Sequence, residues 1–281
     1  MIKIGTWRRK IEGYNSKAMG FVQSLACEVC GLTFSPQGLR NLCDCGGPLL
    51  VRYPLAEIRQ WWTRESLANE PNIPSRGMWK YYPVLPAPPE EAVTLGEGLT
   101  PLLPLRRLGR RLGMEKLWLK DEGQNPTGSF KARGMSAAVT MARRLGATRL
   151  AAPSAGNAGG ALAAYAACVG LESHIYMPDD VPQANYLECK AAGAQVTLIP
   201  GLLSDCGRLV TENAKKQGWF EVSTLKEPYR VEGKKTMGYE IAEQLHWELP
   251  DAIVYPCGGG VGLIGIWKAF EEMEELGWIG R

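Results

Sequence analysis

The stretch KARGMSAAVTMARRLGATRLAAPSAGNAGGALAAYAACV, residues 131–169, predicts a helix, a strand and a second helix in direct succession. The expected helices are Lys131–Leu145 and Asn157–Val169, and the expected strand is the short apolar segment Arg149–Ala152. Short apolar strands that alternate with helices are typical of an α/β protein with a parallel sheet. We therefore expect an α/β fold for this part of the chain.

The same alternation extends along the chain in both directions. Upstream, we expect a strand at Leu117–Lys120. Downstream, the expected strands are Ser173–Met177, Gln195–Ile199, Phe220–Val222 and Ala252–Tyr255, and the expected helices are Gln183–Ala192, Ser204–Gln217, Arg230–Leu245 and Gly262–Leu276. Residues 53–95 differ, because they are rich in Trp, Tyr and Pro. They suggest an extended segment packed onto something larger, with at most one helix near Leu55–Leu67.

Length, composition and charge exclude several classes of protein. The 281 residues are enough for about two domains, and 45% hydrophobic with 22% charged residues is ordinary for a globular chain. The net charge of +3 is dispersed and gives no electrostatic footprint for nucleic acid. No apolar run approaches the roughly 20 residues of a membrane helix, and the first residues are too polar for a secretory signal. We expect a cytoplasmic protein with neither a nucleic-acid nor a membrane partner.

Four cysteines cluster near the N-terminus with the spacing Cys27-x2-Cys30-x12-Cys43-x-Cys45. Two close pairs on turns that contain glycine can complete a tetrahedral thiolate site for zinc. Such a site would be structural, because four thiolates leave no open position for chemistry. The alternative is a metal-free loop with free thiols.

The turn Asn125-Pro-Thr-Gly-Ser-Phe-Lys131 comes directly before a predicted helix. Its small and polar residues expose backbone N–H groups at a helix start, which favours an anion. The same environment disfavours the ammonium form of Lys131, and Schiff-base chemistry requires a lysine with a lowered pKa. The alternative is an ordinary solvated lysine at a helix end.

Two further small-residue turns follow predicted strands. Ser154-Ala-Gly-Asn157 lies at the carboxyl end of a strand, where open α/β sheets bind ligands. Asn157 can cap the next helix, offer its amide to a ligand, or do both. The loop Gly258-Gly-Gly-Val-Gly262 precedes another helix, and consecutive glycines let N–H groups converge on a phosphate. Its alternative is a dinucleotide site, but no second strand follows to supply the acidic ribose partner.

Taken together and in this order, the motifs resemble those of threonine synthase, a member of the fold-type II pyridoxal-phosphate enzymes. The resemblance covers roughly residues 21–278 and includes the cysteine segment. Besides the turns already quoted, it rests on Thr94-Leu-Gly-Glu-Gly-Leu-Thr-Pro-Leu102, Leu119-Lys-Asp-Glu122 and Pro228-Tyr-Arg-Val-Glu-Gly-Lys-Lys-Thr236.

The resemblance implies a fold, a cofactor and roles for individual residues. The implied fold is the tryptophan synthase β-like α/β fold with an N-terminal zinc-ribbon-like segment. Lys131 would carry pyridoxal 5′-phosphate as a Schiff base, and Asn157 would hydrogen-bond the pyridoxal 3′-oxygen. Ser154 and Arg230 would bind substrate, with Arg230 on its phosphate. The cofactor phosphate would be held by Gly258, Gly259, Gly260, Val261 and Gly262.

The implied reaction converts O-phospho-L-homoserine and water into L-threonine and phosphate through an aldimine of the cofactor, in a homodimer. The expected units are an extension (1–23), the cysteine segment (24–52), a larger cofactor domain (53–132 and 229–281) and a smaller domain (133–228). Two departures are visible: Thr224-Leu225 replaces the usual Asn-Ser, and the family continues beyond the position of Arg281. Cysteate synthase, threonine dehydratase and a truncated non-catalytic homologue therefore remain as alternatives.

Overall fold

The structure is a computed structural model that describes residues 21–69 and 74–280. Most of the expected N-terminal extension, residues 1–23, lies outside these ranges. The described part begins with a three-stranded antiparallel sheet made of β1 (Ser24–Cys27), β2 (Thr33–Phe34) and β3 (Leu49–Arg52). Leu25 of β1 pairs with Val51 of β3, and both side chains are buried in the largest apolar core.

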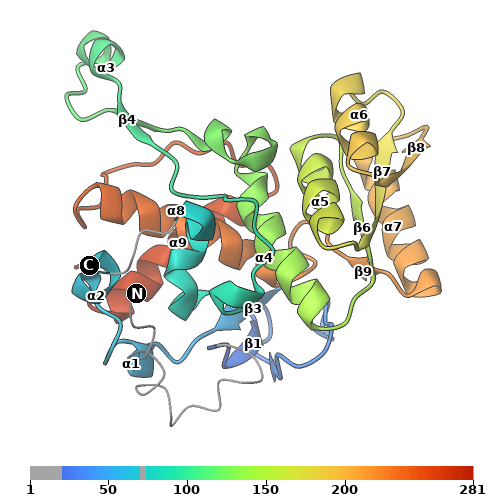
Figure 1. Ribbon diagram of the computed structural model, residues 1–281, viewed down its shortest axis with the longest axis horizontal. Coiled ribbons are helices and arrows are strands. Elements are labelled where there is room, and N and C mark those ends of the chain that lie inside the picture. The colour runs from blue at the N-terminus through green and yellow to red at the C-terminus, as the bar shows by residue number, and fades with distance from the viewer. Residues whose placement is uncertain (1–20, 70–73, 281) are drawn as a thin grey trace, which may run out of the picture.

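The α/β region predicted around residues 131–169 is confirmed. Four parallel strands form a sheet in the order β8-β7-β6-β9, at the right of Figure 1. The strands are β6 (Arg149–Pro153), β7 (Glu172–Pro178), β8 (Gln195–Ile199) and β9 (Phe220–Glu221). The helices packed on them are α5 (Asn157–Cys168), α6 (Gln183–Ala191) and α7 (Leu203–Gln217).

Strand β6 shows why this sheet needs a helix on each face. Leu150 and Ala152 pack into the core that contains α5, whereas Ala151 between them packs with Cys206 and Val210 of α7. Successive strand residues point to opposite faces, so an uninterrupted apolar strand buries both faces. The sheet is therefore covered on both sides.

A second layer is built around one central helix. Helix α8 (Tyr229–Gln244) is buried over nearly its whole length between α4 (Lys131–Arg144) and α9 (Val261–Glu275). The predicted bounds of α8 and α9 differ from the observed ones by one residue at each end. None of the helices in the described ranges is long and apolar enough to cross a membrane.

Three sequence predictions of secondary structure need correction. The strand expected at Leu117–Lys120 exists as β5 (Trp118–Lys120), but it pairs antiparallel with β4 (Leu102–Pro104) and lies outside the parallel sheet. The strand expected at Ala252–Tyr255 is wrong: no strand of the described residues lies beside it to accept its hydrogen bonds, and Val254 is fully exposed.

The single helix expected near Leu55–Leu67 is also wrong, since two short helices, α1 (Leu55–Ile58) and α2 (Arg64–Ala68), occupy this segment. Thr63 caps α2, because its side chain accepts from Ser66 N and its backbone N–H donates to the Ser66 hydroxyl. Such a reciprocal cap marks the start of a new helix, so α1 and α2 do not form one continuous helix. The following segment is mostly 3₁₀ turns, in η2 (Pro74–Val84) and η3 (Pro89–Glu91).

Strands β4 and β5 and the helix between them, α3 (Arg106–Leu112), form an arm that projects from the body of the molecule (Figure 1). Two more 3₁₀ turns, η4 (Glu122–Gln124) and η5 (Pro126–Gly128), lead from β5 back to α4. The division into a larger and a smaller domain stays a prediction, and α4 contacts elements of both expected units, α8 and α5.

Candidate active site

The turn before α4 is held in place by Asn125. Its amide oxygen accepts the backbone N–H of Gly98 at 3.0 Å, and its amide nitrogen donates to the Glu122 carboxylate at 2.8 Å. Thr127 and Gly128, both in the left-handed region at φ 60° and 65°, then reverse the chain. Lys131 thereby becomes the first residue of α4. The buried amide of Asn125 joins three of the quoted motifs, 94–102, 119–122 and 125–131.

Lys131 lies beside the glycine loop, although 127 positions separate them in the chain. A Cβ placed on Gly258 would be 3.6 Å from Lys131 Nζ, and Nζ lies 4.3 Å from the centre of the Phe130 ring. The pKa of Lys131 is lowered, first by burial and then by the positive charge of Arg230. The sequence predicts a lowered pKa of Lys131 from the backbone N–H groups at the helix start. In the structure the pKa is lowered, but by burial and by a neighbouring cation.

The loop 258–262 has the backbone that a phosphate cradle needs. Gly258 and Gly260 are left-handed, at φ 54° and 80°, and α9 begins directly afterwards at Val261. A Cβ on Gly259 would lie 2.4 Å from the Thr224 methyl carbon, and one on Gly262 would lie 1.9 Å from the Tyr255 hydroxyl oxygen. Packing thus requires glycine at positions 259 and 262, the positive φ favours it at 258 and 260, and N–H groups at the start of a 15-residue helix favour an anion.

Ser154 and Asn157 have roles that differ from the simplest expectation. The buried Ser154 hydroxyl accepts from the backbone N–H groups of Gly156 at 3.2 Å and Gly159 at 2.8 Å, so Ser154 serves the start of α5. The capping role considered for Asn157 is wrong, because Asn157 is the first residue of α5, exposed, and without a side-chain hydrogen bond to the described residues. Its amide is available to a ligand, and η5 packs against its helix.

Arg230 lies near the start of α8 and is only 3% exposed. Its Nη1 donates to the carbonyl of Val222 at 3.1 Å, while Nε has no partner among the described residues. The carboxylate of Glu227 accepts the backbone N–H groups of Tyr229 and Arg230, at 2.8 and 2.9 Å. Burial raises the pKa of Glu227 to about 7 against the opposing effect of Arg230.

Lys234, one helical turn after Arg230, was missed by the sequence analysis as a site residue. It is 2% exposed, and its Nζ lies 4.7 Å from the centre of the same Phe130 ring that Lys131 contacts. The pKa of Lys234 is lowered to about 6 by burial and by the charges of Arg230 and Lys131. The signal that could have identified it is its spacing of four residues from Arg230.

The four clustered cysteines meet as the sequence predicts. Cys27 and Cys45 approach to 3.6 Å between their Sγ atoms, Cys30 and Cys43 approach to 3.4 Å, and all four Sγ atoms lie within 4.8 Å of one another. The four sulfurs are thus close enough to surround a single ion with bonds of about 2.3 Å. This cluster could hold zinc.

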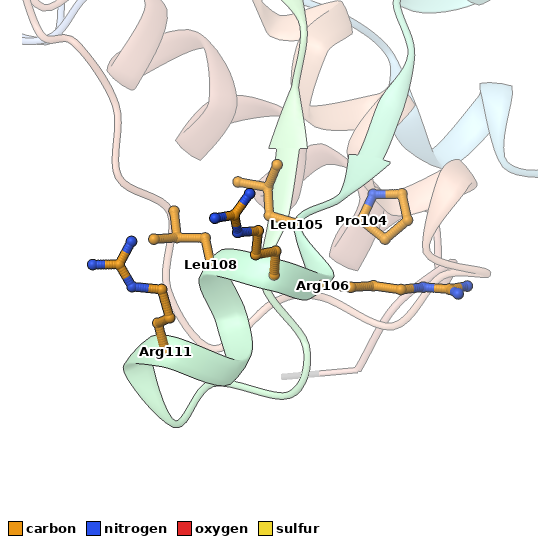
Figure 2. A pocket seen from close by; sticks show the side chains of 6 residues that line it. Pro104, Leu105, Arg106, Leu108 and Arg111 are labelled. Carbon is orange, nitrogen blue, oxygen red and sulfur yellow. The ribbon is translucent and has the colours of Figure 1, made fainter.

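A hollow lies beside α3, in the projecting arm, and it lacks the features of a reaction site. Pro104, Leu105, Arg106, Arg107, Leu108 and Arg111 line it. Figure 2 shows that Arg106 and Arg111 point to opposite sides of the short helix. Because these cations do not converge on one point, we place the candidate active site at Lys131.

Comparison with known proteins defines the class to which the chain belongs. Residues 93–279 match the model of the pyridoxal-phosphate dependent enzyme family, and the chain belongs to that family. The cofactor of the family is therefore pyridoxal phosphate, and the glycine cradle beside the half-buried Lys131 fits it.

Within this class, the chain is similar to threonine synthases, which confirms the resemblance seen in the motifs. It is 36% identical to threonine synthase from Methanocaldococcus jannaschii over 89% of the chain and 61% of that protein. It is 38% identical to threonine synthase from Methanosarcina acetivorans, over 90% and 61%. The chain thus spans about three fifths of the length of these relatives.

A solved structure confirms the predicted fold class. Diaminopropionate ammonia lyase from Escherichia coli, in its apo form, superposes with a TM-score of 0.59 at 23% identity, covering 66% of this chain and 59% of that one. At this identity the likeness concerns the fold alone.

Proposed function

We propose that the chain carries a threonine synthase-type lyase site, which converts O-phospho-L-homoserine and water into L-threonine and phosphate. The observation that carries the proposal is that Lys131 lies beside the glycine loop and within the electrostatic influence of Arg230. A lysine for the cofactor, a cradle for its phosphate and a buried arginine for a second phosphate are the parts that this reaction needs.

Each of these groups then has a defined role. Lys131 would hold the cofactor covalently, and the backbone of residues 258–262 would bind the cofactor phosphate. When bound, the cofactor withdraws electrons from the Cα of an amino acid. The amino group of the substrate would displace Lys131 from the cofactor, and burial and Arg230 favour the neutral form of the released amine, which could then take the Cα proton and return it. Asn157 would orient the pyridoxal ring.

Arg230 would bind the substrate phosphate, which leaves from Cγ before water adds at Cβ. Guanidinium groups suit phosphate because they donate from a planar fork, and the free Nε leaves part of this fork available. Ser154 would fix the loop that faces the substrate. The homodimer and the cytoplasmic location stay predictions.

A visible spectrum with added pyridoxal phosphate, before and after borohydride, tests the cofactor assignment. We expect a yellow band that reduction fixes onto the peptide containing Lys131. A colourless chain without an adduct would contradict the proposal and favour a non-catalytic homologue.

Phosphate or keto-acid release then tests the substrate. We expect phosphate release from O-phosphohomoserine, and little reaction with O-phosphoserine or threonine. Preference for phosphoserine would favour a cysteate synthase type, and keto-acid release from threonine would favour a dehydratase type.

A further inference from the structure

Two adjacent lysines of α8 are buried in opposite electrostatic situations. Lys235 Nζ lies 2.9 Å from a carboxylate oxygen of Glu272 and also pairs with Glu232. Lys234 has no ion pair or side-chain hydrogen bond with the described residues, although it is 2% exposed. The surroundings of Lys234 lack the anion that those of Lys235 supply, and an unpaired ammonium on a side chain that is mostly buried is costly.

The groups around Lys234 are mostly cations. Arg230 lies one turn earlier on α8, and Lys131 of α4 approaches the same Phe130 ring, at 4.3 Å from its centre against 4.7 Å for Lys234. Glu227, at the start of α8, is the carboxylate that acts on Lys234, and its oxygens already accept two backbone N–H groups. Two cations, Arg230 and Lys131, thus act on Lys234 against a single carboxylate.

The position of Lys234 is fixed by close packing. A Cβ on Gly134 of α4 would lie 3.2 Å from Lys234 Cε, and also 3.2 Å from the carbonyl oxygen of Arg230. The lysine stem thus runs past a glycine of α4, with its end group near Phe130. Because the stem is confined between two buried helices, Lys234 cannot extend freely to solvent as a surface lysine does.

We propose that Lys234 is a phosphate-binding residue, which forms with Arg230 a two-cation receptor for a phosphate dianion. This inference rests on the proposed function, because it concerns the same site. Two charges match a dianion better than Arg230 alone, whose own charge is partly balanced by Glu227. The lowered pKa of Lys234 adds a consequence: the amine is mostly neutral in the empty site and takes up a proton as phosphate enters.

Titration with inorganic phosphate tests the receptor. The protein is the full chain loaded with pyridoxal phosphate, measured calorimetrically near pH 7.5 in two buffers of different ionisation enthalpy. We expect wild type to bind phosphate with net proton uptake. Lys234→Gln should weaken binding about tenfold and abolish that uptake, and Lys234→Arg should bind phosphate without it. Lys215→Gln, on the exposed end of α7, is the matched control and should behave as wild type.

A second titration identifies the source of the phosphate. If the cofactor supplies it, Lys234→Gln will weaken loading with pyridoxal phosphate relative to pyridoxal and leave binding of inorganic phosphate to the loaded chain unchanged. If the substrate supplies it, Lys234→Gln will weaken binding of inorganic phosphate to the loaded chain and leave loading with pyridoxal phosphate relative to pyridoxal unchanged. A folded Lys234→Gln variant that matches wild type in both titrations would overturn the proposal.

Failure of the proposed function gives a different result. A chain that takes up no pyridoxal phosphate, but binds inorganic phosphate through Lys234, would contradict the lyase assignment and retain the receptor. The opposite outcome is a wild-type chain that takes up pyridoxal phosphate but binds no inorganic phosphate, and whose preference for pyridoxal phosphate over pyridoxal is unchanged in Lys234→Gln. That result would support the cofactor assignment and contradict the receptor.

Discussion

Arg230 shows how one buried side chain can report on a ligand. Its guanidinium uses one backbone carbonyl and leaves Nε without a partner among the described residues. Buried donors are usually satisfied, and an orphan in a candidate site calls for a specific explanation. A substrate phosphate beside Nε would supply the missing acceptor.

Arg230→Ala should therefore raise KM for O-phosphohomoserine by about tenfold to a hundredfold, the cost of removing a charged hydrogen bond. Pyridoxal-phosphate loading, followed by absorbance, should remain unchanged. Simultaneous loss of cofactor and substrate binding would instead show general structural damage.

Lys234→Met tests the electrostatic cost of the neighbouring lysine. The pKa of Lys234 in the folded chain, about 6, lies below the ordinary value of 10.5. Above pH 10.5 the lysine is neutral in both the folded and the unfolded chain, so its burial then carries no cost of losing a charge. The cost grows as pH falls towards 6 and then levels off. Lys234→Met should thus stabilise the ligand-free chain by at least about 1 kcal/mol at pH 7, and by clearly less at pH 10. Urea unfolding at both pH values measures this, and equal effects at both would argue against a neutralised lysine.

Among the elements, α4 and α8 depend on one glycine. A Cβ on Gly233 would lie 1.9 Å from the carbonyl oxygen of Arg133, and a backbone atom inside a helix cannot move aside easily. Gly233→Ala should lower the free energy of unfolding by about 3 kcal/mol, even though Ala is the better helix former.

Gly207→Ala in α7 is the control for this contact. The nearest atom to its new Cβ is a Pro153 carbon at 3.9 Å, which is ordinary contact. This variant should be neutral or stabilised by up to about 1 kcal/mol. If urea unfolding showed equal destabilisation in both variants, the close approach of α4 and α8 would not be the cause.

The cysteine segment is tied to the active-site region by Asn41. Its amide nitrogen donates to the carbonyls of Glu221 and Lys226, both at 2.7 Å. These residues flank the turn whose Val222 carbonyl holds Arg230. Movement of the cysteine loop therefore has a direct path to the turn that supports Arg230.

Elemental analysis should find about one zinc per chain, bound through the four thiolates. Chelation should then increase amide exchange in residues 221–226, because Asn41 loses its fixed support. In Asn41→Ala the same amides should exchange faster before chelation and change little after it. A metal-free chain would contradict the zinc assignment, and unchanged exchange on zinc loss would contradict the coupling.

The helices α8 and α9 and the strands β6, β7 and β8 could be predicted from sequence, because their apolar patterns are local and strong. The bounds of α8 and α9 follow from local patterns and hold to within a residue. Ala252–Tyr255 has the composition of a strand, but pairing depends on a neighbour that local sequence does not reveal. The spacing of Lys234 from Arg230 can be read in the sequence, but only the structure shows that Lys235 pairs with two carboxylates while Lys234 pairs with none among the described residues.

At the scale of the whole molecule, one buried ion network joins three parts of the fold. Arg133 of α4 binds Glu122, which follows β5, at 2.7 Å and Glu240 of α8 at 2.6 Å. Glu240 also accepts from Lys120 of β5 at 2.7 Å. The arm, α4 and α8 are thus joined by one network of ion pairs.

Glu240→Gln should destabilise the whole chain, because it leaves Arg133 and Lys120 without their shared carboxylate. The expected loss at pH 7 is about 3–5 kcal/mol, typical for a broken buried ion pair. Burial alone would raise the pKa of Glu240, but Arg133 and Lys120 outweigh it and lower the pKa to about 2, against an ordinary 4.5. The contribution of Glu240 to stability is therefore complete above about pH 4.5 and is lost as pH falls towards 2. Thermal unfolding from pH 7 to pH 3 should show wild type losing stability more steeply than Glu240→Gln below pH 4.5. The exposed control Glu248→Gln should follow wild type throughout, and parallel curves for wild type and Glu240→Gln would mean that other carboxylates cause the acid sensitivity.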